Sequence, residues 1–265
     1  MRIMFLGDIV GVSGCNAIHK NLNECIKKNN IDFIVANGEN ASNDGVGITK
    51  EIADSLFDIG IDVITTGNHI WDQKETAEFI EQEPRLLRPQ NLLFPSPGNG
   101  FGIYIKKNYK IGVLNLMGNV FMKKSEDVFK TALEFQKKNI LKKDFDFLII
   151  DFHGEITSEK MALGHLFDGK ATLVVGTHTH VPTSDTRILE KGTAYQTDAG
   201  MCGDYNSVIG MDKNNSLNRF LKKESVKHFP ANGEGTLSGV IVEANENNGL
   251  ANHVKNFIFG GALKS

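Results

Sequence analysis

Residues 176–180 read Gly-Thr-His-Thr-His and directly follow a short apolar run. The run, residues 171–175, is rich in β-branched side chains and predicts a buried strand. In extended backbone, histidines at positions i and i+2 lie on one side of the chain. Two neutral imidazoles that point the same way at a strand end are typical of a site for a divalent transition metal. The pattern alone is also compatible with a polar turn that carries two solvated histidines.

Four other predicted strands end in the same manner, with a small or polar turn and then a possible ligand. These residues are Asp8, Glu39 with Asn40, Asn68 with His69, and His153. In α/β folds, ligands gather outside the carboxyl ends of strands. Each residue has an ordinary alternative, since Asp8 could cap a turn and His153 could be a buried, hydrogen-bonded histidine. All the strand ends together predict a shared binding site rather than core packing.

The types of ligand constrain the metals. Three histidines, two carboxylates and one or two asparagine carbonyls exceed what one four- or five-coordinate ion can use. They fit two ions about 3.5–4 Å apart with a carboxylate between them. Mixed nitrogen and oxygen ligation without a thiolate suits divalent or trivalent Fe or Mn, with Zn, Co or Ni as alternatives, and disfavours copper(I) or an iron–sulfur cluster.

The composition limits the class of protein. The chain has 265 residues, 40% hydrophobic and 23% charged, with a net charge of -3. This balance argues against a broad basic face for nucleic acid, but it does not exclude small phosphorylated ligands. Three widely spaced cysteines predict no disulfide framework. Because there is no signal-peptide pattern and no apolar run near the ~18 residues that span a bilayer, we expect a cytoplasmic protein without membrane association.

Strands and helices alternate in the part of the chain that carries the candidate ligands. Apolar runs predict strands at 2–6, 33–36, 63–66 and 147–150, a strand pair at 101–105 and 111–116, and the strand before His178. Thr49 is expected to cap a helix. Asp72 with Glu75 resembles a capping box for a helix that ends at Pro84. Beyond His180 we expect strands at 193–197, 238–243 and 254–259, with a helix near 217–221.

The early alternation predicts largely parallel strands with helical crossovers, and the later strands suggest a second sheet. The expected fold is therefore α/β, a four-layer helix–sheet–sheet–helix sandwich in one domain, residues 1–265, with the metal site at the carboxyl ends of the strands. The lysine pairs at 137–138, 142–143 and 222–223 are expected to lie on solvated helix faces.

The order Asp, Glu-Asn, Gly-Asn-His, His, Gly-Thr-His-Thr-His resembles the calcineurin-like metallophosphoesterase superfamily. Within it, the sequence is similar to the YmdB-like bacterial branch of 2′,3′-cyclic-nucleotide phosphodiesterases, over residues 1 to about 210. The specific motifs are Gly67-Asn68-His69 and Gly176-x-His178-x-His180. Two positions differ from the wider superfamily: Val10 stands where Asp-x-His has its histidine, and Glu39 replaces an aspartate. Both differences resemble the YmdB-like branch.

The resemblance implies two sets of metal ligands that share Glu39 as a bridge. The first set is Asp8, Glu39, Asn40 and His180, and the second is Glu39, Asn68, His153 and His178. Because Val10 leaves the first metal short of an imidazole, Asn40 is expected to supply the missing contact. His69 is implied to be the catalytic proton donor, with orientation of the Asn68 loop as its alternative role.

The implied reaction opens a 2′,3′-cyclic nucleotide to a nucleoside monophosphate. Two cations would lower the pKa of a water held between them and give a hydroxide nucleophile. Protonation of the departing alkoxide by His69 would contribute about 10²–10⁴-fold in rate. No substrate-binding residue is assigned. Loops 43–47 and 200–204 could border the pocket, and Arg85 and Arg88 could meet a phosphate, but ordinary turns and surface charge explain them equally well.

Other functions remain open on the sequence alone. The nearest alternative is the same metal chemistry on a phosphomonoester or on RNA ends. A metal-dependent amidohydrolase is disfavoured because such β/α barrels place H-x-H at their first strand. A regulatory protein that binds a nucleotide or a partner without turnover is disfavoured, since a pure binder needs no proton donor. The resemblance also implies a homo-oligomer, for which the residues themselves give no signal.

Overall fold

The protein is described here by a computed structural model, which places residues 1–221 and 227–263. Five strands form the first sheet, in the order β13–β12–β1–β3–β4. They are β1 (Arg2–Leu6), β3 (Phe33–Asn37), β4 (Val63–Thr65), β12 (Leu237–Ala244) and β13 (Ala251–Phe259). β1, β3 and β4 are parallel, as predicted, whereas β12 runs antiparallel to β1 and β13. The expectation that the late strands build a separate sheet is therefore wrong for β12 and β13.

The second sheet has six strands in the order β5–β6–β7–β8–β10–β9. They are β5 (Phe101–Lys106), β6 (Tyr109–Met117), β7 (Phe147–His153), β8 (Leu173–Thr177), β9 (Arg187–Ile188) and β10 (Ala194–Gln196). β6, β7, β8 and β10 are parallel. A short parallel pair, β2 (Asp8–Ile9) with β11 (Met201–Cys202), extends from the end of β1.

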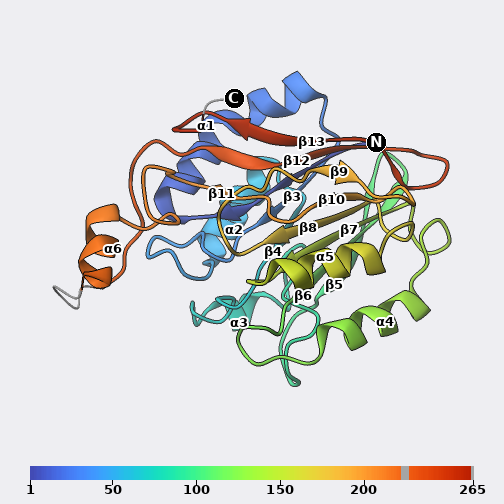
Figure 1. The fold of residues 1–265 in the computed structure, drawn as a ribbon, viewed down its shortest axis with the longest axis horizontal. Helices are drawn as coiled ribbons and strands as arrows, with labels where there is room; N and C mark the ends of the chain where they lie inside the picture. Colours follow the sequence, from blue (N-terminus) through green and yellow to red (C-terminus); the bar gives the residue numbers. More distant parts are fainter. Residues whose placement is uncertain (222–226, 264–265) are drawn as a thin grey trace.

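Helices cover the outer faces of both sheets. α1 (Gly11–Asn29) and α2 (Lys50–Asp58) pack on the first sheet, and α4 (Val128–Lys138) and α5 (Thr157–Leu166) pack on the second. Between the sheets, side chains such as Phe5 meet others such as Ile149 in a core that both sheets share. Figure 1 shows α1 toward the top of the view and α4 toward the bottom, with strands of both sheets between them. The predicted helix–sheet–sheet–helix sandwich is thus confirmed.

Two predicted helix starts have different outcomes. The Thr49 side chain accepts a hydrogen bond from the backbone N–H of Ile52, at 3.3 Å, and caps α2 as expected. The helix predicted from Asp72 to Pro84 is wrong, because α3 is only the single turn Thr76–Phe79 and Asp72 caps nothing. The Asp72 carboxylate instead contacts His69.

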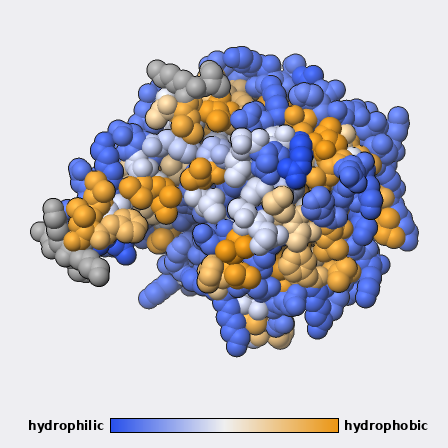
Figure 2. All heavy atoms as spheres, viewed as in Figure 1, coloured by the Kyte–Doolittle hydropathy of each residue, from blue (hydrophilic) through white to orange (hydrophobic). Residues whose placement is uncertain are grey.

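The short helix α6 (Lys213–Phe220) lies at the left of Figure 1, beyond the strands. Only Asn215 and Ser216 of this helix are buried, and its apolar side chains form part of the hydrophobic surface at the left of Figure 2. The lysine pairs at 137–138 and 142–143 are exposed as expected, but only the first lies on a helix, since residues 142–143 form a turn beyond α4. The pair at 222–223 lies outside the described residues. Within the described residues, none of the helices combines the length and apolar character needed to cross a bilayer.

Candidate metal centre

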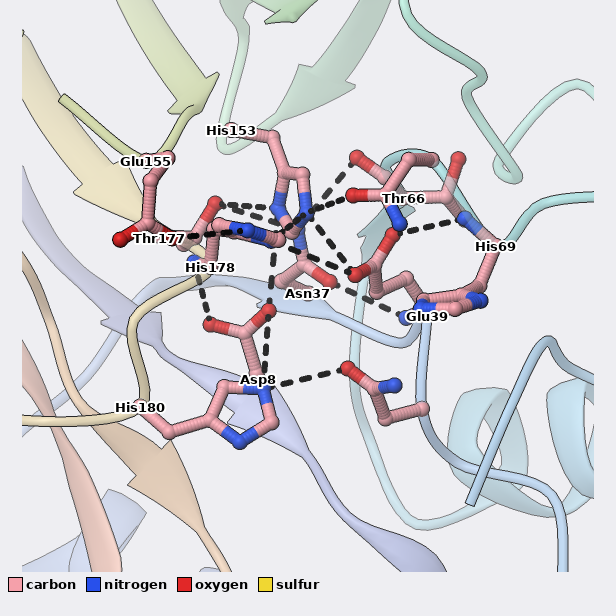
Figure 3. Close-up of polar contacts among 12 residues, drawn as sticks. Asp8, Asn37, Glu39, Thr66, His69, His153, Glu155, Thr177, His178 and His180 are labelled. Carbon is pink, nitrogen blue, oxygen red and sulfur yellow. Dashed lines mark hydrogen bonds and ion pairs between the residues drawn. The ribbon is translucent and has the colours of Figure 1, made fainter. Parts of the chain in front are cut away.

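The predicted ligands all lie at the carboxyl ends of strands from both sheets. Asp8 is in β2, just after β1, and His153 is the last residue of β7. Glu39 with Asn40, Asn68 with His69, and His178 with His180 follow β3, β4 and β8 respectively. The two sheets meet here, since Glu39 Oε1 lies 2.8 Å from His153 Nε2. Side chains far apart in the chain therefore converge at one edge of the sandwich (Figure 3).

Gly67 has a packing reason to precede Asn68. A Cβ added to Gly67 would lie 2.3 Å from Glu39 Oε2 and 2.2 Å from His153 Cδ2, which is closer than atoms can approach. Only glycine lets the end of β4 approach these two side chains. The Gly-Asn-His sequence thus combines a close backbone approach with two functional side chains.

One group of candidate ligands surrounds His153 Nε2. Besides Glu39, the neighbours of this nitrogen are Asn68 Oδ1 at 3.2 Å and His178 Nδ1 at 3.0 Å. Glu39, His153 and His178 each offer one ligand atom within 4.8 Å of the others. Such spacings fit a common ion, because Zn²⁺-type ligands lie about 2.0–2.2 Å from the metal. This group has the composition of the second ligand set predicted from the sequence.

A second group adjoins the first and contains Asp8, Asn40 and His180. His180 Nε2 lies 3.2 Å from Asn40 Oδ1 and 3.9 Å from Asp8 Oδ1. Asp8 Oδ2 accepts the backbone N–H of His178 at 3.1 Å, whereas its Oδ1 is buried and has no hydrogen-bond partner. Val10, which replaces the histidine of the wider superfamily, is buried at the start of α1. Asn40 lies beside His180, where the first ligand set needs the contact that Val10 cannot supply.

Contacts outside the centre fix which nitrogen of each imidazole carries a proton. Thr177 Oγ1 donates to Asp151 Oδ1 at 2.7 Å, so it accepts from His153 Nδ1 at 2.9 Å. His180 Nδ1 lies 2.7 Å from the carbonyl oxygen of Ile209, which can only accept. His178 Nε2 contacts the Glu155 carboxylate at 3.2 Å. In each neutral ring the other nitrogen, with its lone pair, therefore faces the centre.

In the neutral rings, the nitrogens that face the centre are hydrogen-bond acceptors, and they lie opposite other acceptors. Asn40 Nδ2 donates to the carbonyl of Gly45 at 2.8 Å, which leaves Asn40 Oδ1 opposite the lone pair of His180 Nε2. The unpartnered Asp8 Oδ1 adds a buried charge, and burial raises the pKa of Asp8 although His180 and His153 act to lower it. Buried acceptors without donors are unstable unless a cation lies between them. The residues present therefore fit bound metal ions.

Burial also shapes the titration of the imidazoles. It lowers the pKa of His178 to about 3, with neighbouring His153 adding to the effect, so His178 is neutral near pH 7. Burial acts to lower the pKa of His153 as well, but the carboxylates of Glu39, Asp8 and Asp151 together outweigh it and the net shift is upward. Without a cation, His153 and Glu39 therefore form a buried ion pair, and a bound metal would take the place of the His153 proton.

His69 is oriented by Asp72, the residue that the sequence predicted to cap a helix. Its Nδ1 donates to Asp72 Oδ2 at 2.6 Å, and its backbone N–H donates to Glu39 Oε2 at 3.1 Å. His69 lines a cavity of about 550 Å³ that also contacts Glu39, Asn40, His178 and His180. With Nδ1 held by Asp72, Nε2 is the ring nitrogen that remains for chemistry.

The remaining substrate candidates from the sequence have mixed outcomes. Loop 43–47 contributes Asp44 and Val46 to the cavity lining. Segment 200–204 instead contains β11, which pairs with the strand that carries Asp8. Arg85 pairs with Glu83 at 2.7 Å, Arg88 donates to the carbonyl of Pro97 at 3.0 Å, and neither lines the cavity. Lining residues that sequence reasoning missed are Glu155, Thr179, Ile209, Met211, Lys227 and His228.

The four-layer sandwich, with histidines, carboxylates and asparagines at its strand ends, defines a hydrolase of the calcineurin-like metallophosphoesterase class. Residues 4–257 match the family of YmdB-like proteins. The chain belongs to this family.

Relatives of known sequence or structure agree with this assignment. The chain is 44% identical to the 2′,3′-cyclic-nucleotide 2′-phosphodiesterase of Bacillus subtilis, over 93% of this chain and 92% of that protein. A crystal structure of a phosphatase from Mycoplasma pneumoniae has a TM-score of 0.90 and 36% identity, covering 98% of this chain and 93% of that one. A Thermus thermophilus protein has the same TM-score of 0.90 with 34% identity, over 98% of this chain and 99% of its own.

Proposed function

We propose that the chain is a dinuclear-metal phosphodiesterase that hydrolyses 2′,3′-cyclic nucleoside monophosphates. The observation that carries the proposal is the set of inward-facing imidazole nitrogens of His153, His178 and His180, next to the buried carboxylates of Asp8 and Glu39. They form two adjoining groups, one around His153 Nε2 and one around His180 Nε2, between which the Glu39 carboxylate is the proposed bridge. The similarity to the 2′,3′-cyclic-nucleotide 2′-phosphodiesterase of B. subtilis supports the choice of substrate.

The size of the cavity favours a small substrate. About 550 Å³ lies within the range of pockets for small molecules and cofactors, about 300–1,000 Å³. Besides the candidate metal ligands, the cavity is lined by the apolar Ile209 and Met211 and the cation Lys227. We propose that the apolar pair contacts the nucleoside and that Lys227 offsets charge on the phosphate. RNA ends would have to present one nucleotide into the same cavity.

The chemistry divides between the metals and His69. Asp8, Glu39 and the three inward imidazoles would hold the two cations. When bound, these ions would supply positive charge beside the phosphate and lower the pKa of a water toward neutrality. His69 lines the cavity, and its protonated ring would give the Nε2 proton to the departing ribose oxygen, which would otherwise leave as a strong base. Asp72 holds the ring in this orientation through Nδ1.

The first test measures metal content and substrate choice on the same preparation. We expect about two transition-metal ions per chain, loss of turnover after chelation and recovery on adding Mn²⁺ or Fe²⁺. Among 2′,3′-cyclic, 3′,5′-cyclic and monoester nucleotides, the 2′,3′-cyclic substrate should have the highest kcat/KM. Full turnover after chelation would exclude metal catalysis, and preference for monoesters would establish a phosphomonoesterase instead.

A second test concerns Asp72. Asp72→Asn should reduce kcat about 10- to 100-fold, because hydrogen bonds to charged groups contribute about 1.5–3 kcal/mol. Metal content should stay the same, since Asp72 contacts His69 and not the ligands. Lys123→Ala is the control, because Lys123 Nζ contacts the other oxygen of Asp72 at 3.3 Å. An equal loss in both variants would assign the effect to the surface ion pair.

A further inference from the structure

A buried ion pair lies directly behind the metal centre without contributing a ligand. Lys160 Nζ of α5 contacts Asp198 Oδ2 at 2.7 Å, and both side chains are only 1% exposed. Burying two charges is costly and rarely stabilises a fold more than apolar side chains would. The pair therefore needs a reason beyond stability.

The hydrogen bonds that the Asp198 carboxylate accepts indicate what the pair does. Its Oδ2 accepts both the backbone N–H of Thr179, at 3.2 Å, and the Thr179 hydroxyl, at 2.7 Å. Its Oδ1 accepts the backbone N–H of Gly200 at 2.8 Å. The carbonyl of Gly200 in turn accepts the backbone N–H of Asp8 at 3.1 Å. The Asp198 carboxylate thus holds Thr179, which lies between His178 and His180. Through Gly200 it also holds the backbone of Asp8.

The backbone of the histidine loop has an unusual conformation. The φ angles of His178 and His180 are 97° and 65°, in the left-handed region that residues with a Cβ rarely adopt. Such a conformation persists only when surrounding contacts hold it. Thr179, between the two, is the residue that Asp198 fixes through both backbone and side chain.

Lys160 reaches Asp198 only because residue 176 is glycine. A Cβ added to Gly176 would lie 2.8 Å from Lys160 Cδ and 1.9 Å from the carbonyl oxygen of Thr197. The lysine stem therefore passes directly under the first residue of the Gly-Thr-His-Thr-His motif. Its ammonium balances the Asp198 carboxylate in a buried region that already contains the carboxylates of Asp8, Glu39 and Asp151.

We propose that Asp198 and Lys160 are positioning residues for the metal centre, and that they set metal affinity by holding His178, His180 and Asp8 in their binding geometry. The inference rests on the proposed metal site and adds to it a paired charge that touches neither metal nor substrate. Thr179 is the link through which Asp198 acts on the two histidines. Removing a residue that orients metal ligands without touching the metal typically lowers metal affinity about 10- to 100-fold.

Thr179→Val tests the link with little risk to folding, because it keeps the shape of the side chain and removes only the hydroxyl. We expect metal affinity, measured by competition with a chromophoric chelator for Mn²⁺ or Zn²⁺, to fall about 10-fold or more. The thermal midpoint of the metal-free protein should stay at the wild-type value. Thr179→Ser, which keeps the hydroxyl, should restore wild-type affinity.

The ion pair itself is tested by the double variant Lys160→Met with Asp198→Asn, which leaves no unpaired buried charge. Its metal affinity should fall about 10- to 100-fold. Asp185→Asn is the matched control, because Asp185 accepts from Thr183 and Thr197 next to the same loop but does not contact Thr179. Metal affinities within twofold of wild type in both Thr179→Val and the double variant would overturn the inference. If the wild-type protein itself bound no metal, the proposed function would fail first, and the two outcomes are thereby distinguished.

Discussion

His69→Ala is expected to lower kcat on 2′,3′-cyclic nucleotides about 10²- to 10⁴-fold, the usual contribution of a positioned general acid. Metal content should not change, because the His69 ring is held by Asp72, outside the inward-facing acceptors, and only its backbone N–H contacts Glu39. The measurement is kcat together with metal stoichiometry on the same sample. A variant with normal turnover and normal metal content would remove His69 from the mechanism.

The leaving group separates proton donation from a merely structural effect. A nitrophenyl phosphodiester releases a weakly basic nitrophenolate that needs no proton, so His69→Ala should lose much less activity on it than on a cyclic nucleotide. A loss of the same size on both substrates would indicate that His69 only orients the Asn68 loop. His253→Ala, at an exposed histidine of β13, is the control and should match the wild type on both substrates.

Glu39→Gln is expected to weaken metal binding by more than about 100-fold, beyond the effect of removing an outer partner. The reason is that both oxygens of Glu39 are used, Oε1 beside His153 Nε2 at 2.8 Å and Oε2 by the N–H of His69 at 3.1 Å. A glutamine keeps the shape but removes the charge that two cations would share, and turnover should be lost with the metals.

Elemental analysis after gel filtration, compared with the wild type, measures this effect. Because Glu39 is proposed as a shared ligand, both ions should be lost together, whereas a change at a ligand of one ion alone would leave the other. Retention of one full equivalent in Glu39→Gln would contradict the bridging role. Glu51→Gln, on the exposed side of α2, is the matched control and should keep both ions.

Much of the fold follows from local patterns. The buried strands β1, β3, β4, β7 and β8 coincide with mainly apolar runs, because a strand covered on both faces needs apolar side chains at most positions. The pairing of β12 with β1 could not be predicted in this way, since an apolar strand fits either sheet equally well. Only the space left beside β1 places β12 in the first sheet, more than two hundred residues along the chain.

Asp72 shows where a local rule misleads. An aspartate three residues before a glutamate fits the start of a helix, and the sequence offers no reason to prefer another role. In the folded chain the carboxylate instead accepts from His69 Nδ1, at the same i, i+3 spacing but in a turn. Nothing in the sequence indicated that Lys160 and Asp198 are buried and paired, because a charged residue on a helix or in a loop is usually solvated.

By itself, the sequence determined that ligand-type side chains follow five strands, and parallel strands bring such ends together. The tertiary structure alone decided which imidazole nitrogen faces inward, because that depends on Thr177, Glu155 and the carbonyl of Ile209. The tertiary structure also decided that the buried Lys160–Asp198 ion pair lies next to the ligand loop. Hydrogen-bond direction and burial depend on contacts between residues far apart in the chain, and no local spacing encodes them.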